Sequence, residues 1–566
     1  MIVWQAVAAA LAAEKMPVVF GLPGGERFFD SVAEYPEIRR VVPRDPRAAP
    51  FMAMGYTRVS GRPAVCHSSG GPGVALLVPG ILEAYAACQP VIAIVGSSRR
   101  SGAGQGALQE YDQVGVFRPI TKWAERVTEP DRIWWVMRKA FSVAMNGKPG
   151  PVFIDIPRDV GLQEVAPRDY VPADCPIRTA GDPARIRAAV ELLRAAQRPV
   201  IVVGGGGVSS RAFAEVRRLA ELIGAPVLTT PCGRGIIAED HPLSCGQVGL
   251  YFSDLGQRVY DDADLLITLG SRNEDFQSGE QKFFPRGARY IQVDIDPDEV
   301  GRNWAADVAV VGDVKLVLQA WVDELAREPL PADAVVSRVS SLAASKASFE
   351  VQVREDAATD DVPLKTKRVI RELNEVLGPN TILVNENGAQ DLWSYSWPYY
   401  RVLDENCCVA PGEQTCMGGG CAAAIGAKLA MPERNVVCPT GDGAFQMFTN
   451  ELATAVQFGA PVFYLVLNNR RLGWIAYHQR KRSDHPINTE FEVQPDFMKV
   501  AEANQCFGVR VERPEEIRPA LERALAATRA GTPAVVECIV DGWDFSFGFN
   551  NFYERLARKG EARGKA

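Results

Sequence analysis

The sequence predicts an α/β protein with three doubly wound, parallel-sheet domains. Short apolar runs alternate with helical stretches along most of the chain, which is typical of parallel strands covered by helices on both faces. The chain has 566 residues, too many for one core and enough for three or four units of about 150 residues. Apolar residues make up 47% and charged residues 23%, the balance of a soluble globular protein.

The first domain is expected over residues 1–165, where strand-like runs lead into glycine turns in VVFGLPGG, PAVCHSSGGPG and PVIAIVGSS. The second is expected over residues 185–330, from RPVIVVGGGG to RYIQVDID. The third is expected over residues 365–545, from TILVNENG to AVVECIVDG. Periodic helical segments separate the strands in each domain, so all three are expected to share one architecture.

The stretches between and beyond these domains have a different composition. Residues 160–184 are rich in Pro, Asp and Arg, and residues 327–365 lose strand character and become rich in Ala, Ser and charge, so both are expected to be linkers. The charged tail after Phe552 is expected to fray. The first segment, MIVWQAVAAALAAEKMP, lacks the basic start of a signal peptide and contains Glu14 and Lys15. We expect an amphipathic helix there.

Charge and cysteine usage limit the partners and the compartment. The formal net charge of −7 argues against a broad nucleic-acid-binding surface, and no uninterrupted apolar run is long enough to span a bilayer. The twelve cysteines form no CxxC pairs at zinc spacing and fit small buried residues better than a disulfide framework. We therefore expect a cytoplasmic protein that binds neither nucleic acid nor membrane.

The strongest chemical signal lies in the third domain, where two strands end in polar residues. One strand leads into Gly441-Asp442-Gly443, and the next leads into Asn468-Asn469. Because parallel strands converge at their carboxyl ends, Asp442 and Asn469 can offer oxygens to one Mg²⁺. The glycines let the backbone approach a diphosphate, and a helix N-terminus supplies N–H groups. A GDG turn alone is common, and its spacing from the two asparagines is what favours a metal–diphosphate site.

This GDG motif, the helix and strand that follow it, and the two asparagines resemble the fingerprint of thiamine-diphosphate enzymes. The resemblance covers nearly the whole chain and is greatest to acetolactate synthase and its relatives. It implies thiamine diphosphate and Mg²⁺ as cofactors, with the metal held by Asp442, Asn469 and the backbone carbonyl of Arg471. It places these residues at the cofactor: Gly25, Gly388, Ala389, Gln390, Thr415, Met417, Gly441, Asp442, Gly443, Ala444, Asn469, Arg471, Leu472 and Gly473.

Two positions in the third domain are expected to shape the cofactor. Met417 matches the bulky apolar residue that bends the cofactor into a V in this family, and the carbonyl of Thr415 is expected to accept a hydrogen bond from its aminopyrimidine. Ordinary core filling is the usual role of an isolated methionine. Ala389 and Gln390 stand where Gln-His is common in the family, so one side-chain contact to the diphosphate is expected to be missing.

The first two domains carry further parts of the resemblance. Gly25 lies in FGLPGG, and Gln109 lies in LQEYD and aligns with a glutamine that reaches over the reacting centre in this family. The central domain binds FAD in acetolactate synthases and other nucleotides or nothing elsewhere, so FAD stays open. The family's site lies between the first domain of one subunit and the third of another. A homodimer or homotetramer is therefore implied.

The glutamate that protonates the pyrimidine ring in most family members is absent here. Counting back from Gly55 places Pro46 at its position, with Asp45 one residue earlier and one methylene shorter. Either Asp45 swings in and does the same work, or the site has no carboxylate there, as in glyoxylate carboligase, whose valine at this position still supports catalysis. Pro46 biases Asp45 toward an extended conformation. We favour the second reading, and an exposed surface position is the common alternative for Asp45.

The helix that begins the family's active-site lid carries another departure. Acetolactate synthases usually have Gln-Trp where this chain has Tyr477-His478, so strict acetolactate synthesis is in doubt. His478 is a candidate proton carrier near pH 7. Gln109 and His478 are the two candidates for handling protons in the reaction. A solvated surface histidine is the commoner situation on such a helix.

The function expected from the resemblance is decarboxylation of a 2-oxo acid such as pyruvate, carboligation to an acyloin or 2-hydroxy-3-oxo acid, or both. Two alternatives stay open. A catalytically silent or regulatory relative would fit the missing glutamate. A nicotinamide-dependent oxidoreductase is prompted by the run Val203–Gly207, which follows a strand but lacks a G-x-G-x-x-G register.

Overall fold

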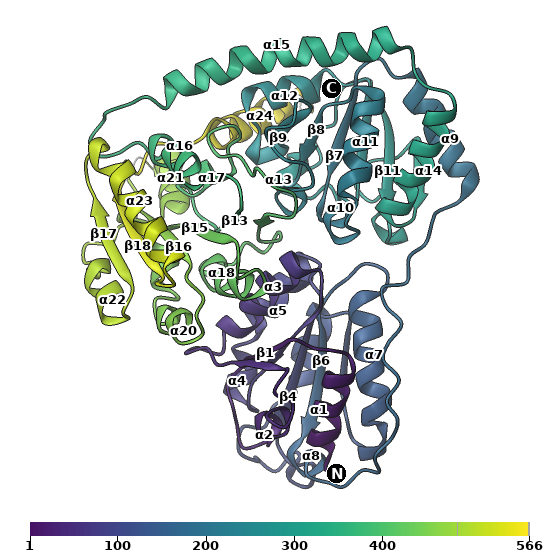
Figure 1. The fold of residues 1–566 in the computed structure, drawn as a ribbon, viewed down its shortest axis with the longest axis vertical. Helices are drawn as coiled ribbons and strands as arrows, with labels where there is room; N and C mark the ends of the chain where they lie inside the picture. Colours follow the sequence, from purple (N-terminus) through teal and green to yellow (C-terminus); the bar gives the residue numbers. More distant parts are fainter. Residues whose placement is uncertain (484, 564–566) are drawn as a thin grey trace.

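Three six-stranded parallel sheets organise the chain, and this confirms the predicted fold class. The computed structural model describes residues 1–483 and 485–563. In Figure 1 the first domain lies at the bottom, the central domain at the upper right and the third domain at the left. All pairs of neighbouring strands in the three sheets are parallel within the described residues, as expected for sheets whose faces are covered by helices.

The first sheet has the strand order β2-β1-β3-β4-β6-β5. Its strands are β1 Val18–Gly21, β2 Arg39–Val41, β3 Ala64–His67, β4 Val91–Ser97, β5 Trp123–Arg126 and β6 Val152–Pro157. The helices are α1 Val3–Ala13, α2 Phe28–Val32, α3 Ala48–Ser60, α4 Pro72–Ala75, α5 Val78–Ala86, α6 Gln113–Phe117, α7 Ile133–Met145 and α8 Arg158–Gly161. Alternate strand residues serve different cores: Val19 packs with α1 and α7, whereas Phe20 packs with α3 and α5.

The central sheet has the order β12-β11-β10-β7-β8-β9 around its own core. Its strands are β7 Pro199–Val203, β8 Val227–Thr229, β9 Ser244–Gln247, β10 Leu265–Leu269, β11 Arg289–Asp294 and β12 Val308–Val311. The helices are α9 Pro183–Ala195, α10 Gly205–Ser209, α11 Phe213–Ile223, α12 Asp254–Asp261, α13 Asp275–Ser278 and α14 Val314–Arg327. Before α9, residues 165–182 form no helix or strand.

The third sheet has the order β14-β13-β15-β16-β18-β17. Its strands are β13 Thr381–Val384, β14 Cys408–Val409, β15 Asn435–Gly441, β16 Phe463–Asn468, β17 Phe507–Val511 and β18 Ala534–Ile539. The helices are α16 Thr366–Leu377, α17 Leu392–Tyr395, α18 Gly419–Ala430, α19 Asp442–Gln446, α20 Glu451–Gln457, α21 Gly473–Ser483, α22 Phe497–Ala503, α23 Ile517–Arg529 and α24 Phe547–Arg563.

The first and third domains of the chain share one core through helices α3 and α18. These helices cross where α18 of the third domain meets the top of the first domain in Figure 1. A Cβ on Gly55 would lie closer than 3.0 Å to the backbone of Ala423, and one on Gly426 would also lie closer than 3.0 Å to the backbone of Met52. The two glycines therefore let the helix backbones touch.

Two expectations about the segments outside the domains were wrong. Most of residues 327–365 form α15, Ala332–Asp356, a helix of 25 residues that runs along the top of Figure 1. Its interior has no Gly or Pro and is rich in helix-forming residues, and Phe349 and Val353 pack on Trp397. The tail after Phe552 continues α24 as far as Arg563 instead of fraying there, because Phe549 and Phe552 are buried and Arg555 pairs with Asp261. Residues 564–566 of that tail lie outside the described residues.

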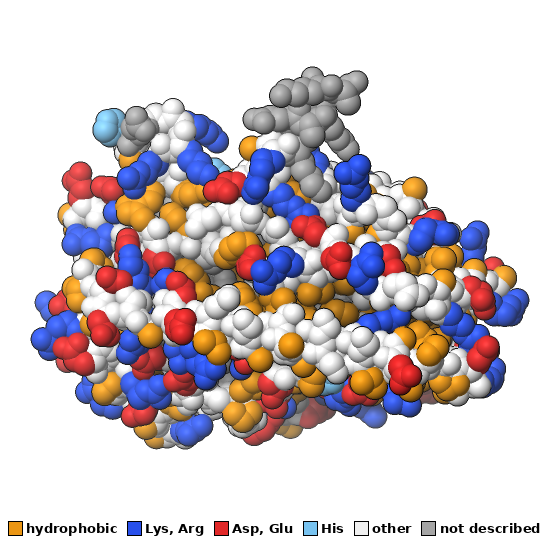
Figure 2. Space-filling model, turned by 90° about the horizontal axis from the view of Figure 1, so that it is seen from above, with side chains coloured by type: hydrophobic (Ala, Val, Ile, Leu, Met, Phe, Trp, Pro, Cys, Tyr) orange, Lys and Arg blue, Asp and Glu red, His pale blue; other side chains and the backbone are white. Residues whose placement is uncertain are grey.

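The surface and the cysteines agree with the composition. Figure 2 looks onto the α15 side and shows Lys and Arg side chains interspersed with Asp and Glu. All twelve cysteines are free. Within the described residues, no helix combines the length and the apolar character needed to cross a membrane.

Candidate active site

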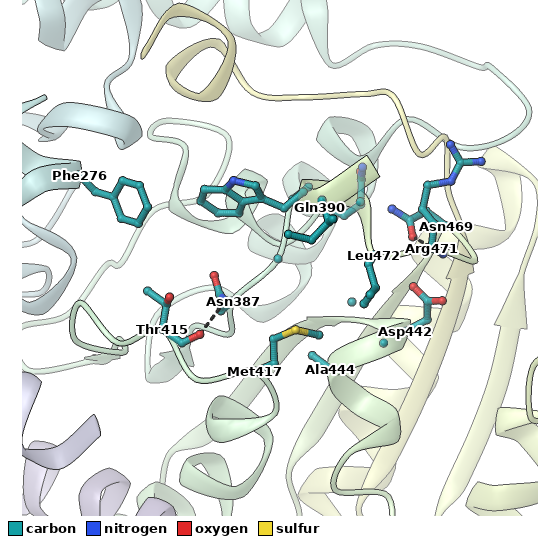
Figure 3. A pocket seen from close by; sticks show the side chains of 17 residues that line it. Phe276, Asn387, Gln390, Thr415, Met417, Asp442, Ala444, Asn469, Arg471 and Leu472 are labelled. Carbon is teal, nitrogen blue, oxygen red and sulfur yellow. Dashed lines mark hydrogen bonds between the residues drawn. The ribbon is translucent and has the colours of Figure 1, made fainter. Parts of the chain in front are cut away.

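A cavity of about 250 Å³ opens at the carboxyl ends of β15 and β16 (Figure 3). Thirteen of the fourteen residues predicted to bind the cofactor line it, and only Gly25 does not. The other lining residues are Asn387, Trp474 and Ile475 of the third domain and Phe276 of the central domain. The stretches around residues 388, 416, 442 and 471, far apart in sequence, therefore meet in one place.

The polar end of this cavity carries the predicted metal ligands. Asp442 begins α19 directly after β15, and Asn469 follows β16, the strand paired with β15. Both side chains are buried, and Figure 3 shows them at the same end of the cavity with Arg471. Within the described residues no group of three His, Cys, Asp or Glu could hold a metal. A carboxylate, an amide oxygen and a backbone carbonyl fit Mg²⁺, which also takes oxygens from phosphate and water.

A second layer around Asp442 was not predicted from the sequence. Burial raises the pKa of the Asp442 carboxyl to about 6, against the effect of a hydrogen bond from the Gln494 side chain. Asn468 donates to Gln494 (2.8 Å) and to Glu537 (2.7 Å), so the first asparagine of the pair orients the neighbours of the site. Gln494 lies in a stretch without a motif, and only the fold brings it to Asp442.

The opposite end of the cavity is built by the loop that precedes α18. Thr415 adopts a φ of 46°, a conformation rare for a residue with a branched side chain, which indicates that the loop is held in place. Its carbonyl accepts a hydrogen bond of 2.7 Å from the Asn387 side chain. In Figure 3, Met417 lies between Thr415 and Ala444. A carbonyl oxygen has two lone pairs, so Thr415 keeps acceptor capacity for a ligand.

Glu83 of α5 holds this loop from the first domain of the same chain. Its buried carboxylate accepts hydrogen bonds from the backbone N–H groups of Gly412 (2.5 Å) and Cys416 (2.8 Å). Burial raises the pKa of the Glu83 carboxyl, and these two bonds oppose the shift. More than 300 residues separate the partners, and no local pattern marks Glu83 as part of the site.

Two buried carboxyl groups lie behind the loop of residues 387–390. Glu386 accepts from the N–H groups of Asn387, Gly418 and Cys421, and burial raises its pKa to about 7. Both carboxyl oxygens of Asp391 are buried without a hydrogen-bond partner in the described part of the chain. A Cβ on Gly388 would lie 2.6 Å from an Asp391 oxygen, so the carboxyl group sits directly behind the loop.

Because the Asp391 carboxyl is buried without a partner in the described part of the chain, its ionisation should lower the free energy of unfolding as pH rises. Burial, and then the charge of Glu386, raise the Asp391 pKa well above its usual value, so the native state favours the protonated acid. Its stabilising effect is complete below about pH 4 and is lost as pH rises. We expect Asp391→Asn to raise the free energy of unfolding by about 1 kcal/mol at pH 8 and by less at pH 5. Thermal unfolding of the parent, Asp391→Asn and the exposed control Asp323→Asn would measure this, and parallel pH profiles would contradict it.

The structure places the site residues of the first domain apart from this cavity. Gly25 and Gln109 line a second cavity of about 370 Å³ that shares no lining residue with the first. Asp45 and Pro46 line neither. The Asp45 carboxylate pairs with Arg47 at 2.6 Å; burial acts to raise its pKa, but the bonds from Arg47 outweigh this and hold the pKa below its usual value.

His478 lies beside the first cavity without lining it. Its Nε2 accepts a hydrogen bond from the indole N–H of Trp474 (3.0 Å) and lies 3.1 Å from the hydroxyl of Tyr553 on α24. Burial, with the charges of Arg482 and Lys481, lowers its pKa and so favours the neutral imidazole. The accepting Nε2 implies a proton on Nδ1.

The central domain has two small cavities at the carboxyl ends of β7, β10 and β11. Each has a volume of about 60 Å³, and they share Gly206, Ser209, Gly270 and Asp294 among their lining residues. A Cβ on Gly206 would meet Gly270 closer than 3.0 Å, so the two strand-end loops touch between the cavities. The sequence left FAD binding by the central domain open, and these cavities do not test it.

Family models match all three domains. Residues 1–116 match the thiamine pyrophosphate enzyme N-terminal TPP binding domain, and residues 186–321 match the central domain. Residues 390–538 match the C-terminal TPP binding domain, a range that holds most of the residues lining the cavity of Figure 3. The three matches follow the three sheets in order.

Curated relatives resemble the chain over almost its full length. A probable acetolactate synthase large subunit from Methanocaldococcus jannaschii is 35% identical, covering 95% of this chain and 91% of the relative. An acetolactate synthase from Mycobacterium bovis is 34% identical over 95% of this chain and 87% of the relative. A glyoxylate carboligase from Escherichia coli O157:H7 is 32% identical over 94% of this chain and 92% of the relative.

Proposed function

Because this chain belongs to the thiamine pyrophosphate enzyme family, we propose that it uses thiamine diphosphate and Mg²⁺ to decarboxylate a 2-oxo acid such as pyruvate, to join it to a second carbonyl compound, or both. The observation that carries the proposal is the cavity at the ends of β15 and β16, where residues from four separate stretches of the third domain converge. The relatives named acetolactate synthase and glyoxylate carboligase support a carboligation step.

The residues at the cavity suit the cofactor's parts. Asp442, Asn469 and the carbonyl of Arg471 would hold Mg²⁺ and, through it, the diphosphate. Backbone N–H groups near Gly388 and at the start of α19 would bind the phosphate oxygens. Met417 would support the bend of the cofactor, and Thr415 would accept from its amino group. When bound, the cofactor supplies an electron sink next to the substrate carbonyl.

The position of Pro46 supports a site without the usual glutamate. Asp45 could replace that carboxylate only if it left Arg47, which donates to it through side chain and backbone. Such charge-assisted bonds are about twice as strong as neutral ones. We therefore propose that neither Asp45 nor Pro46 donates a proton, and that Gln109 and His478 remain candidates for handling protons.

A homodimer would bring the two halves of the site together. Gly25 and Gln109 line the cavity of the first domain, and the metal ligands line that of the third, without a shared residue. Both rims carry exposed apolar side chains, Leu108 at 86% and Ile475 at 51% of full exposure. Contact between the first domain of one copy and the third of another would cover them. Sedimentation that finds an active monomer would contradict this proposal.

The function can be tested by following products directly. Purified protein incubated with thiamine diphosphate, Mg²⁺ and either pyruvate or glyoxylate should release CO₂ and form an aldehyde, an acyloin or a hydroxy-oxo acid, identified by NMR. Omission of the cofactor should stop product formation. Cofactor binding without loss of any tested 2-oxo acid would instead support a catalytically silent relative.

A further inference from the structure

The cavity of the first domain contains a carboxyl group with no established role. This cavity has a volume of about 370 Å³ and lies where β1, β3, β4 and β6 end. It is lined by residues that follow these strands and by the loop that carries Gln109: Gly24, Gly25, Glu26, Ser69, Gly70, Ser97, Ser98, Arg99, Ala107, Leu108, Gln109 and Arg158. Carboxyl ends of parallel strands are the usual place for a ligand in such sheets.

Only one of the two carboxyl oxygens of Glu26 accepts a hydrogen bond within the described residues. Its side chain is only 9% exposed, and its Oε1 accepts a hydrogen bond of 3.2 Å from the N–H of Gly70. Its Oε2 is buried and has no hydrogen-bond partner among the described residues. An unpaired buried carboxylate oxygen costs free energy, so a donor from a ligand would stabilise it.

The chain around Glu26 leaves room for its side chain. A Cβ on Gly24 would lie closer than 3.0 Å to Glu26 Oε2, and one on Gly96 would lie closer than 3.0 Å to its Cγ. Neither glycine has a positive φ, so backbone conformation does not explain why glycine stands at these positions. Room for the Glu26 side chain, and at Gly24 also for Ser69, explains why glycine stands at these two positions.

The remaining lining fits a small anionic substrate. Arg99 and Arg158 line the same cavity with exposed side chains and can bind a carboxylate. The Glu26 oxygen would then face a group that carries or receives a proton. A 2-oxo acid has both features, a carboxylate and a carbonyl oxygen that gains a proton during reaction.

We propose that Glu26 is a catalytic residue of the reaction proposed above, on which this inference rests. Its carboxyl group gives a proton to the substrate's carbonyl oxygen when the carbonyl carbon is attacked, and takes that proton back when the carbonyl re-forms. Over one turnover the proton count is unchanged. Glu26 follows β1, and Pro46 follows the neighbouring strand β2. The carboxyl group of Glu26 therefore lies at the same edge of the sheet as Pro46, but it comes from the adjacent strand.

The test compares Glu26→Gln and Glu26→Asp with the parent and with Glu37→Gln, an exposed glutamate of the same domain outside the cavity. Each full-length protein is assayed for products from pyruvate and glyoxylate, for thiamine diphosphate affinity and for thermal unfolding. Since general acid–base groups contribute about 10²–10⁴-fold, Glu26→Gln should lower kcat by about 100-fold or more. Its cofactor affinity should stay unchanged. Glu26→Asp should recover part of the rate.

The outcomes separate the two proposals. A parent that turns over substrate while Glu26→Gln keeps its kcat would overturn the role of Glu26 and leave the proposed function standing. A parent that binds the cofactor but consumes neither 2-oxo acid would overturn both. Equal losses in kcat, cofactor affinity and melting temperature in both Glu26 variants would mean that Glu26 is structural, which also overturns the proposal.

Discussion

Asp442→Asn should abolish cofactor-dependent activity while the protein stays folded. The variant keeps the size of the side chain and one oxygen but loses the single carboxylate among the predicted metal ligands. Replacing residues that merely support metal ligands costs about 10–100-fold in affinity, so loss of a charged ligand should weaken Mg²⁺-dependent binding of thiamine diphosphate by about 100-fold or more. Calorimetric titration with cofactor and Mg²⁺, with product analysis in parallel, measures both effects.

Stability should change in the opposite direction from binding. The Asp442 carboxyl is buried and its pKa is raised to about 6, so removing its charge relieves a desolvation cost in the cofactor-free protein. The cofactor-free variant should melt at or above the parent temperature, and it should gain less from added cofactor than the parent does. The exposed Asp323→Asn variant controls for the change of charge. Cofactor affinity equal to that of the parent would show that Asp442 holds no metal.

The sequence alone predicted that the residues at the polar end of the cavity would lie close together, because each of them is marked by a local pattern. Asp442 and Asn469 each follow a strand, and parallel topology alone brings such ends to one edge. Alternation of apolar strands with helices predicted the three sheets for the same reason. These signals depend on neighbours in sequence and on rules that hold for every doubly wound sheet.

The residues that the sequence did not reveal act over long distances. Glu83 holds the loop before α18 from another domain, and Gln494 reaches Asp442 from a stretch with no motif. Glu26 stands beside a predicted residue, Gly25, but only the structure shows that one of its oxygens lacks a hydrogen-bond partner in the described part of the chain. Composition misled in the case of α15, because Ala-, Ser- and charge-rich segments suit both linkers and exposed helices.

Gly426→Ala should destabilise the protein, although the same change stabilises most helices. In an ordinary helix interior, alanine is favoured over glycine by about 1 kcal/mol. Here the added Cβ would lie closer than 3.0 Å to the backbone of Met52, and a backbone atom cannot move aside as a side-chain end can. Overpacking a core costs about 1–3 kcal/mol. Set against the gain of about 1 kcal/mol from alanine, the upper end of this range gives an expected net loss of about 2 kcal/mol.

The effect of Gly426→Ala should reach the active site, because α18 begins just after Met417. The same helix packs against α3 of the first domain. Separating the helices by even a fraction of an ångström would shift the loop that carries Thr415 and Met417. Thermal unfolding and cofactor titration of Gly426→Ala should therefore both worsen. Ala430→Ser, which adds one atom to a half-buried position at the end of the same helix, should change neither. A Gly426→Ala protein that melts higher than the parent would mean that α3 and α18 do not pack backbone to backbone, and the link from their crossing to the cofactor site would fail with it.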